Sequence, residues 1–349
     1  DSPFRGKFDE TKWKKAAQAA ADVINLNQYE LHSNISDLFL TRVNREFIFV
    51  HMNQPCSWMT SISIPKNLCP TGRNDKSGCN QVTYNLIKEY EILKDGKAYS
   101  IDDAASGYDD QNPYINRDPR FYRDCLFNGS IYQGKVAQLG EAEGGAPNPP
   151  HNPVEISGFN THVHSVKFAD WDLVLNFDAR DPGKGMSTNQ NFPYIRYAEV
   201  LLNYAEAVFE RDGAISDEDL NLSLNLVRCR INAKMPKLTN AFASTHDLDM
   251  RTEIRRERTI ELFNEGFRID DLKRWKTAET EMPQDFLGIR WTGTEFQNKW
   301  PGITNERNSD GFIILESGRK WEDKHYLYPL PTDQLQLNPN LKQNPGWGE

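Results

Sequence analysis

Three glutamates spaced one helical turn apart are the first residues whose pattern could do chemistry. Glu257, Glu261 and Glu265 recur every four positions, so a helix would place them on one face. Such carboxylates could bind a metal or act as an acid and a base. A dimetal helix normally supplies Glu-x-x-His, however, and no histidine occurs between His246 and His325. Arginines three and four positions away would neutralise the carboxylates, so we predict a structural network of ion pairs.

Two histidines suggest a second kind of site. His162 and His164 are two residues apart, and a strand would point both to one side. Asp170, Asp172 or His151 could complete the metal site of a metal-dependent hydrolase. Because no spacing fixes a third ligand, we predict neither a metal site nor catalytic residues. A paired-carboxylate glycoside hydrolase stays open as an alternative, since the chain has 50 acidic residues.

Acidic loops and cysteines hold the remaining candidate ligands. Asp102-Asp103 and Asp109-Asp110 could attract calcium but lack the EF-hand spacing, and we predict no cofactor. None of the five cysteines belongs to a CxxC pair, which argues against a zinc ribbon. Cys69 and Cys79 bracket a turn-rich loop, where a disulfide and two free thiols are equally compatible with the sequence.

Charge and composition exclude several classes of protein. The chain has 349 residues with 41 basic and 50 acidic side chains, and its formal net charge of −9 argues against a generic nucleic-acid-binding protein. No run of 18 apolar residues occurs, so no membrane-spanning helix is expected. Hydrophobic residues make up 38% of the chain, yet its 8 tryptophans, 13 tyrosines and 18 phenylalanines can build a core.

Helical periodicity appears near the start of the chain and again in its second half. Apolar residues recur at helical spacing over 9–26, 195–212, 216–231 and 247–266, with a shorter helix expected over 269–279. Gly213 is a natural stop for one of these helices, and Ser216 with Asp219 has capping-box spacing for the next. The tight turn between them predicts a helical hairpin. The small residues of Tyr204-Ala205-Glu206-Ala207 are typical of a tetratricopeptide-like unit.

The middle of the chain has a different character. Between residues 41 and 191, short apolar pieces are repeatedly interrupted by proline and glycine. We predict a long region of loops, turns and short strands. Long loops in compact proteins usually carry binding or catalysis, so this region is the expected ligand region.

Four segments resemble signatures of the SusD/RagB family of surface-exposed, glycan-binding outer-membrane lipoproteins. They are NRDPRFY at 116–122, FPYIRYAEVLLNYAEA at 192–207, IRRERTIELFNEGFRIDDLKRW at 254–275, and a tail from YLYPLP at 326–331 to NPGW at 344–347. Their order and spacing agree with the family across most of the chain.

The resemblance implies a mainly α fold, a tetratricopeptide-like helical hairpin scaffold with a large loop-rich insertion containing short strands. It implies one domain over 1–349, with a helical hairpin at 1–40, a loop-rich ligand region at 41–191, a helical scaffold at 192–280 and an irregular C-terminal region at 281–349 packed on the scaffold. Members usually have more chain upstream, including a lipid-attachment cysteine. We therefore expect this chain to correspond to the C-terminal portion of a member.

The family resemblance also implies a function without catalysis. Members capture glycans on the outer membrane of Gram-negative bacteria and deliver them to a TonB-dependent, SusC-like transporter. Membrane attachment is expected only through an N-terminal lipid that this chain lacks, and no nucleic-acid partner is expected. The same role with a peptide or another nutrient as ligand stays open as an alternative.

Sugar binding without chemistry requires flat aromatic faces and polar groups that fix the hydroxyls. The loop-rich region offers Trp58 in a proline-broken stretch, Arg73, Asn74 and Asp75 at the tip of the Cys69 to Cys79 loop, and Tyr132 after the NRDPRF-like segment. For each aromatic residue, ordinary packing against the helices is the alternative. Trp275, Trp321 and Trp347 lie in the scaffold-like motifs and are left out of the predicted site.

Overall fold

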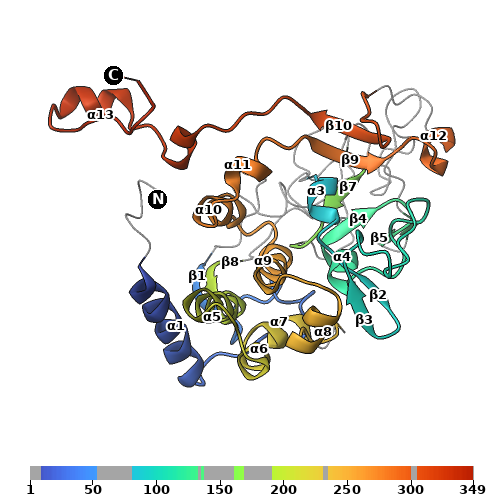
Figure 1. Cartoon of the computed structure of the whole chain (residues 1–349), viewed down its shortest axis with the longest axis horizontal. Helices are drawn as coiled ribbons and strands as arrows, with labels where there is room; N and C mark the ends of the chain where they lie inside the picture. The colour runs from blue at the N-terminus through green and yellow to red at the C-terminus, as the bar shows by residue number, and fades with distance from the viewer. Residues whose placement is uncertain are drawn as a thin grey trace, which may run out of the picture.

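The computed structural model describes residues 9–52, 81–132, 135–136, 161–168, 191–230, 235–299 and 305–348 (Figure 1). In these ranges helices hold far more residues than strands, so the predicted mainly α class is confirmed. The helices are α1 (Glu10–Asn25), α3 (Tyr84–Ile87), α4 (Pro119–Asp124), α5 (Tyr197–Asp212), α6 (Asp217–Leu222), α7 (Leu224–Arg228), α8 (Asn240–Thr245), α9 (Met250–Glu261), α10 (Arg268–Arg274), α11 (Ala278–Glu281), α12 (Glu295–Lys299), the 3-10 helix η1 (Asp323–Tyr326) and α13 (Thr332–Leu337).

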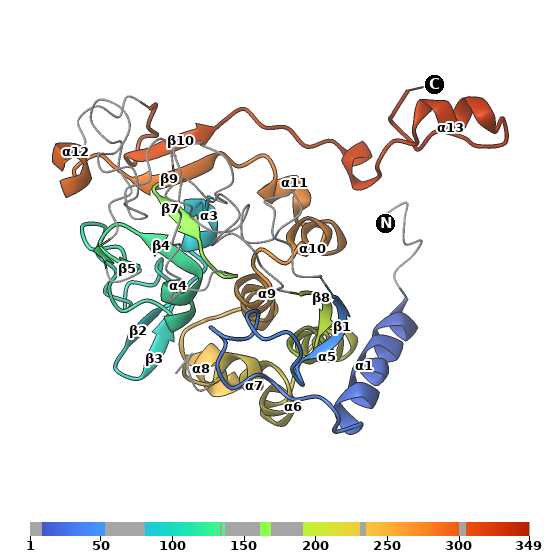
Figure 2. The same cartoon turned by 180° about the vertical axis from the view of Figure 1, so that it is seen from behind.

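The strands form antiparallel pairs, and each described sheet has two strands. The pairs are β1 (Phe47–His51) with β8 (Phe192–Arg196), β2 (Ile92–Lys94) with β3 (Lys97–Tyr99), β4 (Cys125–Phe127) with β7 (Val163–Ser165), β5 (Ile131–Tyr132) with β6 (Lys135–Val136), and β9 (Phe286–Arg290) with β10 (Phe312–Glu316). The pairs other than β1–β8 lie away from α1, across the molecule, as the views from the front and from behind both show (Figure 1, Figure 2).

A first hydrophobic core joins the long helices α1, α5 and α9. Helix α5 packs against both of the others. Ala17 and Ala20 of α1 are buried in this core together with Leu201 and Ala205 of α5, and such small residues let helix backbones approach closely. Gly213 ends α5 in the left-handed conformation, with φ at 71°, as its position in the sequence predicts.

The helix predicted over 216–231 is divided in two. Ser216 caps α6 by accepting a hydrogen bond from the Asp219 N–H at 3.0 Å, which agrees with the predicted start. The helix breaks at Ser223, whose hydroxyl donates to the Asp219 carbonyl at 2.5 Å, and α7 then continues to Arg228. Ser hydroxyls compete with the backbone ladder in this way and favour helix ends.

The range 1–40, predicted to be a helical hairpin, contains a single helix among its described residues. After α1 the chain makes turns until β1. Asparagine side chains stabilise these turns: Asn34 Oδ1 accepts from the Ser36 N–H at 3.0 Å, and Asn44 Oδ1 accepts from the Phe47 N–H at 3.1 Å. The prediction of a second helix here is therefore corrected, and α1 packs instead on α5.

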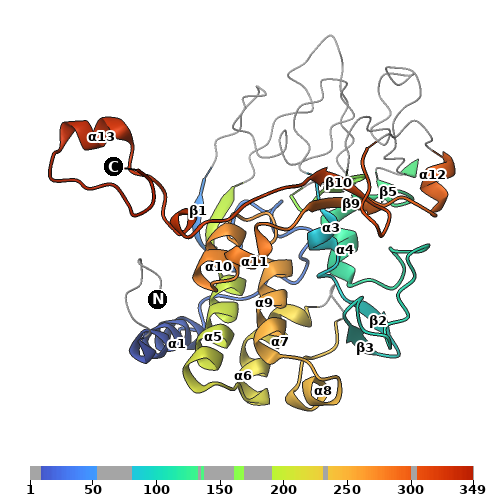
Figure 3. The same cartoon turned by 45° about the horizontal axis from the view of Figure 1, so that its top comes forward.

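A second core lies between α3, α4, the β4–β7 pair and the β9–β10 pair. It contains Phe121, Phe127 and Trp291, and Ile260 extends it to α9. The C-terminal segment beyond β10 then passes over α10 and α11, where Tyr326 is buried, before α13 extends away from the rest of the chain (Figure 3). Among the described helices, none has the length and apolar character needed to cross a bilayer.

Candidate functional site

The NRDPRF-like segment folds into α4 because its residue types suit a helix start. The Asp118 carboxylate accepts from the Arg120 N–H at 2.8 Å, and Pro119 follows at the first helical position. This short helix directs both Arg120 and Phe121 into the interior, where neither is more than 1% exposed. The motif therefore brings a buried charge toward α9.

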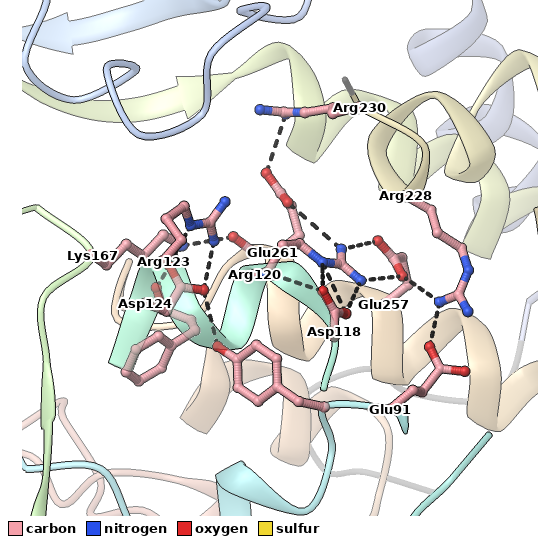
Figure 4. A network of polar contacts seen from close by, with 12 residues as sticks. Glu91, Asp118, Arg120, Arg123, Asp124, Lys167, Arg228, Arg230, Glu257 and Glu261 are labelled. Carbon is pink, nitrogen blue, oxygen red and sulfur yellow. Dashed lines mark hydrogen bonds and ion pairs between the residues drawn. The ribbon is translucent and has the colours of Figure 1, made fainter. Parts of the chain in front are cut away.

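Arg120 begins a network of buried ion pairs with α9. Its guanidinium pairs with Asp118 at 2.7 Å and forms hydrogen bonds with both carboxylate oxygens of Glu257. Glu257 also pairs with Arg228 at 3.1 Å, and Arg228 reaches Glu91 at 2.6 Å. Figure 4 shows this chain of alternating charges running along α9.

The same helix face continues with Glu261 and with Glu265 in the turn that follows. Arg196 pairs with Glu261 at 2.8 Å and Glu265 at 2.7 Å. The Lys167 ammonium bonds Glu265 at 2.7 Å, and Arg230 lies 3.2 Å from Glu261. We call these residues the ionic network, together with those that pair with them: Glu46, Glu91, Asp118, Arg120, Arg123, Asp124, Lys167, Arg196, Arg228, Arg230, Glu257, Glu261 and Glu265.

The predicted ion-pair network is thus confirmed, but its partners differ from those expected. The arginines on α9 itself turn elsewhere: Arg258 pairs with Asp271 at 2.8 Å and Arg256 with Glu253 at 2.5 Å. Distant segments supply the cations for Glu257, Glu261 and Glu265 instead. Spacing within one helix could not reveal this, because it carries no information about which face meets which segment.

Electrostatics lower the pKa values of Glu261 and Glu265. Burial by itself would raise the pKa of Glu261, but Arg230 and Arg196 outweigh it and hold that pKa well below its usual range. Burial is likewise outweighed at Glu265, where Arg196 and Lys167 lower the pKa of the carboxyl group. Carboxylates that are buried, ionised and paired in this way are poorly placed to act on a substrate.

The two histidines do not share a strand face. His162 has a φ of 56° and precedes β7, and its ring lies 5.4 Å from the Trp291 ring. His164 lies within β7 and is buried, and this burial, with His162 nearby, lowers its pKa to about 3. Asp170, Asp172 and His151 lie outside the described residues, and the described part of the chain contains no group of three side chains suited to a metal.

The carboxylates of the acidic loops form bonds within the protein. Asp103 Oδ1 accepts from the Ala105 N–H at 2.7 Å, Asp109 Oδ1 accepts from the Gln111 N–H at 2.9 Å, and Asp110 pairs with Arg290. Asp103 and Asp109 therefore stabilise local turns, whereas Asp110 links its loop to β9. Of the cysteines, Cys125 and Cys229 are free thiols, whereas Cys69 and Cys79 lie outside the described residues, so their pairing stays open.

Most of the predicted glycan-binding residues are not described by the structure. Trp58, Arg73, Asn74 and Asp75 lie outside the described ranges. Tyr132 is the last residue of β5 and pairs with Lys135 of β6, but its side chain is not among those described. The prediction for all five residues therefore remains untested.

Within the described residues, the β1–β8 pair exposes a group of aromatic rings. Phe49 is 59% exposed and Tyr194 is 52% exposed, and their ring centroids lie 5.6 Å apart with 30° between the planes. The exposed His51 ring meets Tyr194 edge-on at 6.4 Å. We call Phe49, His51 and Tyr194 the aromatic patch. Apolar side chains that gather on an exposed surface often mark a binding site.

Irregular strand pairing explains how the patch forms. In a regular strand Phe47 and Phe49 would share one face. The β1–β8 register shifts on both sides of Phe49, so Phe47 is buried beside Leu38 and Phe39 while Phe49 is exposed. The patch was not predicted, because the alternation of residue types along a strand does not reveal a bulge. The available signal was that aromatic residues occur in both of the strands that border the loop-rich region.

A cavity of about 550 Å³ lies elsewhere, among α3, the turn after α9, α10 and β9. Its lining is largely apolar and includes Leu86, Phe263, Phe267, Met282 and Phe286. Several polar groups of its lining are already in use: Asn85 bonds the backbone of residues 285 and 287, and Arg258 bonds Asp271 at 2.8 Å. Such a cavity suits a sugar poorly, so the aromatic patch is the candidate site.

Comparison with known proteins places the chain in a family. The family model described as the SusD family matches residues 45–347. A solved SusD-like carbohydrate-binding protein from Bacteroides fragilis has a TM-score of 0.69 and 25% sequence identity, with the match covering 95% of this chain and 61% of that one. A second SusD-like protein from Bacteroides fragilis has a TM-score of 0.68 at 24% identity, covering 96% and 62%.

A surface glycan-binding protein A from Bacteroides uniformis shares the fold at a TM-score of 0.52 and 19% identity, covering 96% of this chain and 57% of that one. This chain thus spans roughly three-fifths of the length of these solved relatives. The comparison with curated proteins gave no match. Because the family model covers most of the sequence and the fold agrees, the chain belongs to the SusD family.

Proposed function

We propose that this protein binds glycans without catalysis and that the aromatic patch forms part of the binding surface. The observation that carries the proposal is the pair of rings Phe49 and Tyr194, both more than half exposed and inclined by only 30°. Flat rings in such an arrangement can pack against the C–H faces of successive sugar rings. The SusD-like protein from Bacteroides fragilis described as carbohydrate-binding supports the ligand class.

We further propose that the residues predicted from the sequence extend this surface. Trp58 follows β1 closely in the sequence, and Arg73, Asn74 and Asp75 lie further along the same connection. Amide, carboxylate and guanidinium groups next to stacking rings would bond the sugar hydroxyls. In binding sites, apolar rings commonly supply the contact area and a few polar groups fix the orientation of the ligand. Tyr132 would contribute from β5.

The proposed setting is the outer-membrane surface of a Gram-negative bacterium, with a lipid at the N-terminus of the full protein and a SusC-like, TonB-dependent transporter as partner. Family membership supports this setting. We propose that α5 with α6 and α7 forms a tetratricopeptide-like hairpin of the scaffold, since these helices are joined by a tight turn at Gly213 and pack together. A neutral glycan gains little from electrostatic steering, so the net charge of −9 serves solubility.

Glycan binding is tested by screening the protein on a glycan array and measuring the best ligand by calorimetry. Replacing both Phe49 and Tyr194 with alanine should weaken binding by about 1 to 3 kcal/mol per lost stacking face, the range found at other aromatic platforms. Tyr328→Ala is the matched control, because Tyr328 is 67% exposed and does not belong to the aromatic patch. Equal binding by the double variant and the wild type would place the binding surface elsewhere.

Two further outcomes separate the alternatives. Release of reducing ends from the bound oligosaccharide would contradict a purely binding role and favour a glycoside hydrolase. A negative glycan screen combined with binding of peptides would favour the same surface role with another nutrient as ligand.

A further inference from the structure

The carboxylates at the C-terminal end of α9 bind segments that border the predicted ligand region. Glu46 immediately precedes β1, which leads in sequence toward Trp58. Lys167 closely follows β7, and Arg196 is the last residue of β8. Lys167 and Arg196 both bond Glu265, and Arg196 links Glu265 to Glu46. Three segments far apart in the sequence therefore meet at one buried point.

Lys167 and Arg196 have no hydrogen-bonding capacity left over. The Lys167 ammonium has three donors, and it bonds Glu265 Oε1 at 2.7 Å, the Glu261 carbonyl at 2.7 Å and the Phe263 carbonyl at 2.8 Å. The Arg196 guanidinium has five donors and makes five bonds, to Glu46, to Glu261 through both its carboxylate and its carbonyl, and twice to Glu265. Each side chain is thereby held in a single orientation.

This arrangement fixes the base of the aromatic patch. Arg196 stands opposite Phe47 in the β1–β8 register, two residues from Tyr194. The pairing of the two strands is interrupted next to Phe49, so regular ladder bonds alone do not hold β1 and β8 in register. The ion pairs of Arg196 supply the missing constraint, because they tie the end of β8 to Glu265 in the turn after α9 and to Glu46 at the start of β1.

We propose that Glu265 is a positioning residue for ligand binding: by holding Arg196 and Lys167, it sets the orientation of the aromatic patch. This inference rests on the proposed glycan-binding function. It assigns to Glu265 a role beyond stability, since a buried ion pair contributes little net stability compared with an apolar equivalent, although breaking one is costly.

The test compares Glu265→Gln with Glu253→Gln, the same change at another buried glutamate, which lies in α9. Glu253 is 5% exposed and bonds Arg256, so both variants remove one buried carboxylate charge. Denaturation gives the stability of each variant, calorimetry gives the dissociation constant for the glycan that the wild type binds, and amide hydrogen exchange follows residues 47–51 and 192–196. Lys167→Met is a second, milder variant, because it leaves Glu265 bonded to Arg196.

We expect E265Q and K167M to bind glycan on the order of tenfold more weakly and to exchange faster in β1 and β8, because a small misplacement of binding groups costs up to a hundredfold. E253Q should bind like the wild type even if it loses stability. Wild-type affinity in folded E265Q or K167M, or an equal loss of affinity in E253Q, would overturn the positioning role. If the wild type itself binds no glycan, the proposed function fails instead, and the exchange rates in β1 and β8 still decide whether Glu265 holds these strands in register.

Discussion

Replacing Arg196 with methionine is the sharpest test of the ionic network. Methionine keeps an unbranched apolar side chain and removes the guanidinium, so the bonds to three carboxylates are lost together. Each carboxylate keeps another partner, however: Glu46 and Glu261 keep Arg230, and Glu265 keeps Lys167. The change therefore removes one cation from each of three buried carboxylates and leaves each of them with another partner.

The expected loss in the free energy of unfolding follows from the ion pairs that remain. Removing one partner of a buried ion pair costs about 3 to 5 kcal/mol, chiefly because the remaining charge is left uncompensated. Without Arg196 the three carboxylates share two cations, Arg230 and Lys167, so one net charge is left uncompensated. We therefore expect a single cost of about 3 to 5 kcal/mol in the free energy of unfolding at pH 7 and not a threefold one.

The pH dependence gives an independent check with a definite sign. The pKa values of Glu261 and Glu265 are lowered in the folded state, despite burial, by Arg196 together with Arg230 or Lys167. Such groups add stability above their unfolded pKa of about 4.3, and this stability is lost as the pH falls toward the folded pKa. Without Arg196 the two pKa values rise, so R196M has less of this stability to lose. The difference between wild type and R196M should therefore shrink from pH 7 to about pH 3.5.

The assay is equilibrium urea denaturation followed by tryptophan fluorescence at both pH values, with midpoint and slope compared. Arg211→Met is the control, because Arg211 forms a similar close pair with Asp212 at 2.5 Å on the surface, where it is 36% exposed. The control should change stability by less than about 1 kcal/mol. A loss below about 1 kcal/mol for R196M at pH 7, or a difference that grows on acidification, would refute the reasoning.

Two further predictions concern aromatic residues. Trp58→Ala or Tyr132→Ala should weaken glycan binding by about 1 to 3 kcal/mol without loss of the circular-dichroism signal, and unchanged binding in both would remove these residues from the proposed site. Phe121→Ala should lower the free energy of unfolding by about 3 to 5 kcal/mol, because it empties a position with no exposed surface that stacks on Phe127 at 5.1 Å. In the same denaturation series, exposed Phe49→Ala should cost less than about 0.5 kcal/mol, and similar losses for the two would contradict the assigned burial.

The parts of the fold that could be predicted are those governed by local chemistry. Helix α1, the end of α5 at Gly213 and the Ser216 cap follow directly from periodicity and capping residues. The second helix expected within 1–40 is not found among the described residues of that range, because the Asn34 side chain there bonds the backbone in a turn. Likewise, Ser223 divides a helix that its apolar stripe alone would continue.

The candidate site depended on information that spacing does not contain. The row of glutamates could be recognised as structural, but Arg120, Arg196 and Lys167 could not be named as its partners, since they are brought to α9 by the tertiary fold. Phe49 and Tyr194 escaped prediction for a different reason: a register shift of one residue exchanges buried and exposed faces of a strand. The aromatic residues chosen from the loop-rich region remain predictions.

The sequence separation within the ionic network has a consequence for how the protein folds. Glu46 meets Arg230 across 184 residues and Arg196 across 150, and Lys167 meets Glu265 across 98. Contacts between such distant positions form slowly, because the intervening chain must first be ordered. On the ribosome, β1 is made long before residue 265. The β1–β8 pair, which carries the aromatic patch, therefore cannot be held in place until residue 265 has been synthesised. During that interval Phe47, which the complete fold buries, would be available to chaperones or to premature association.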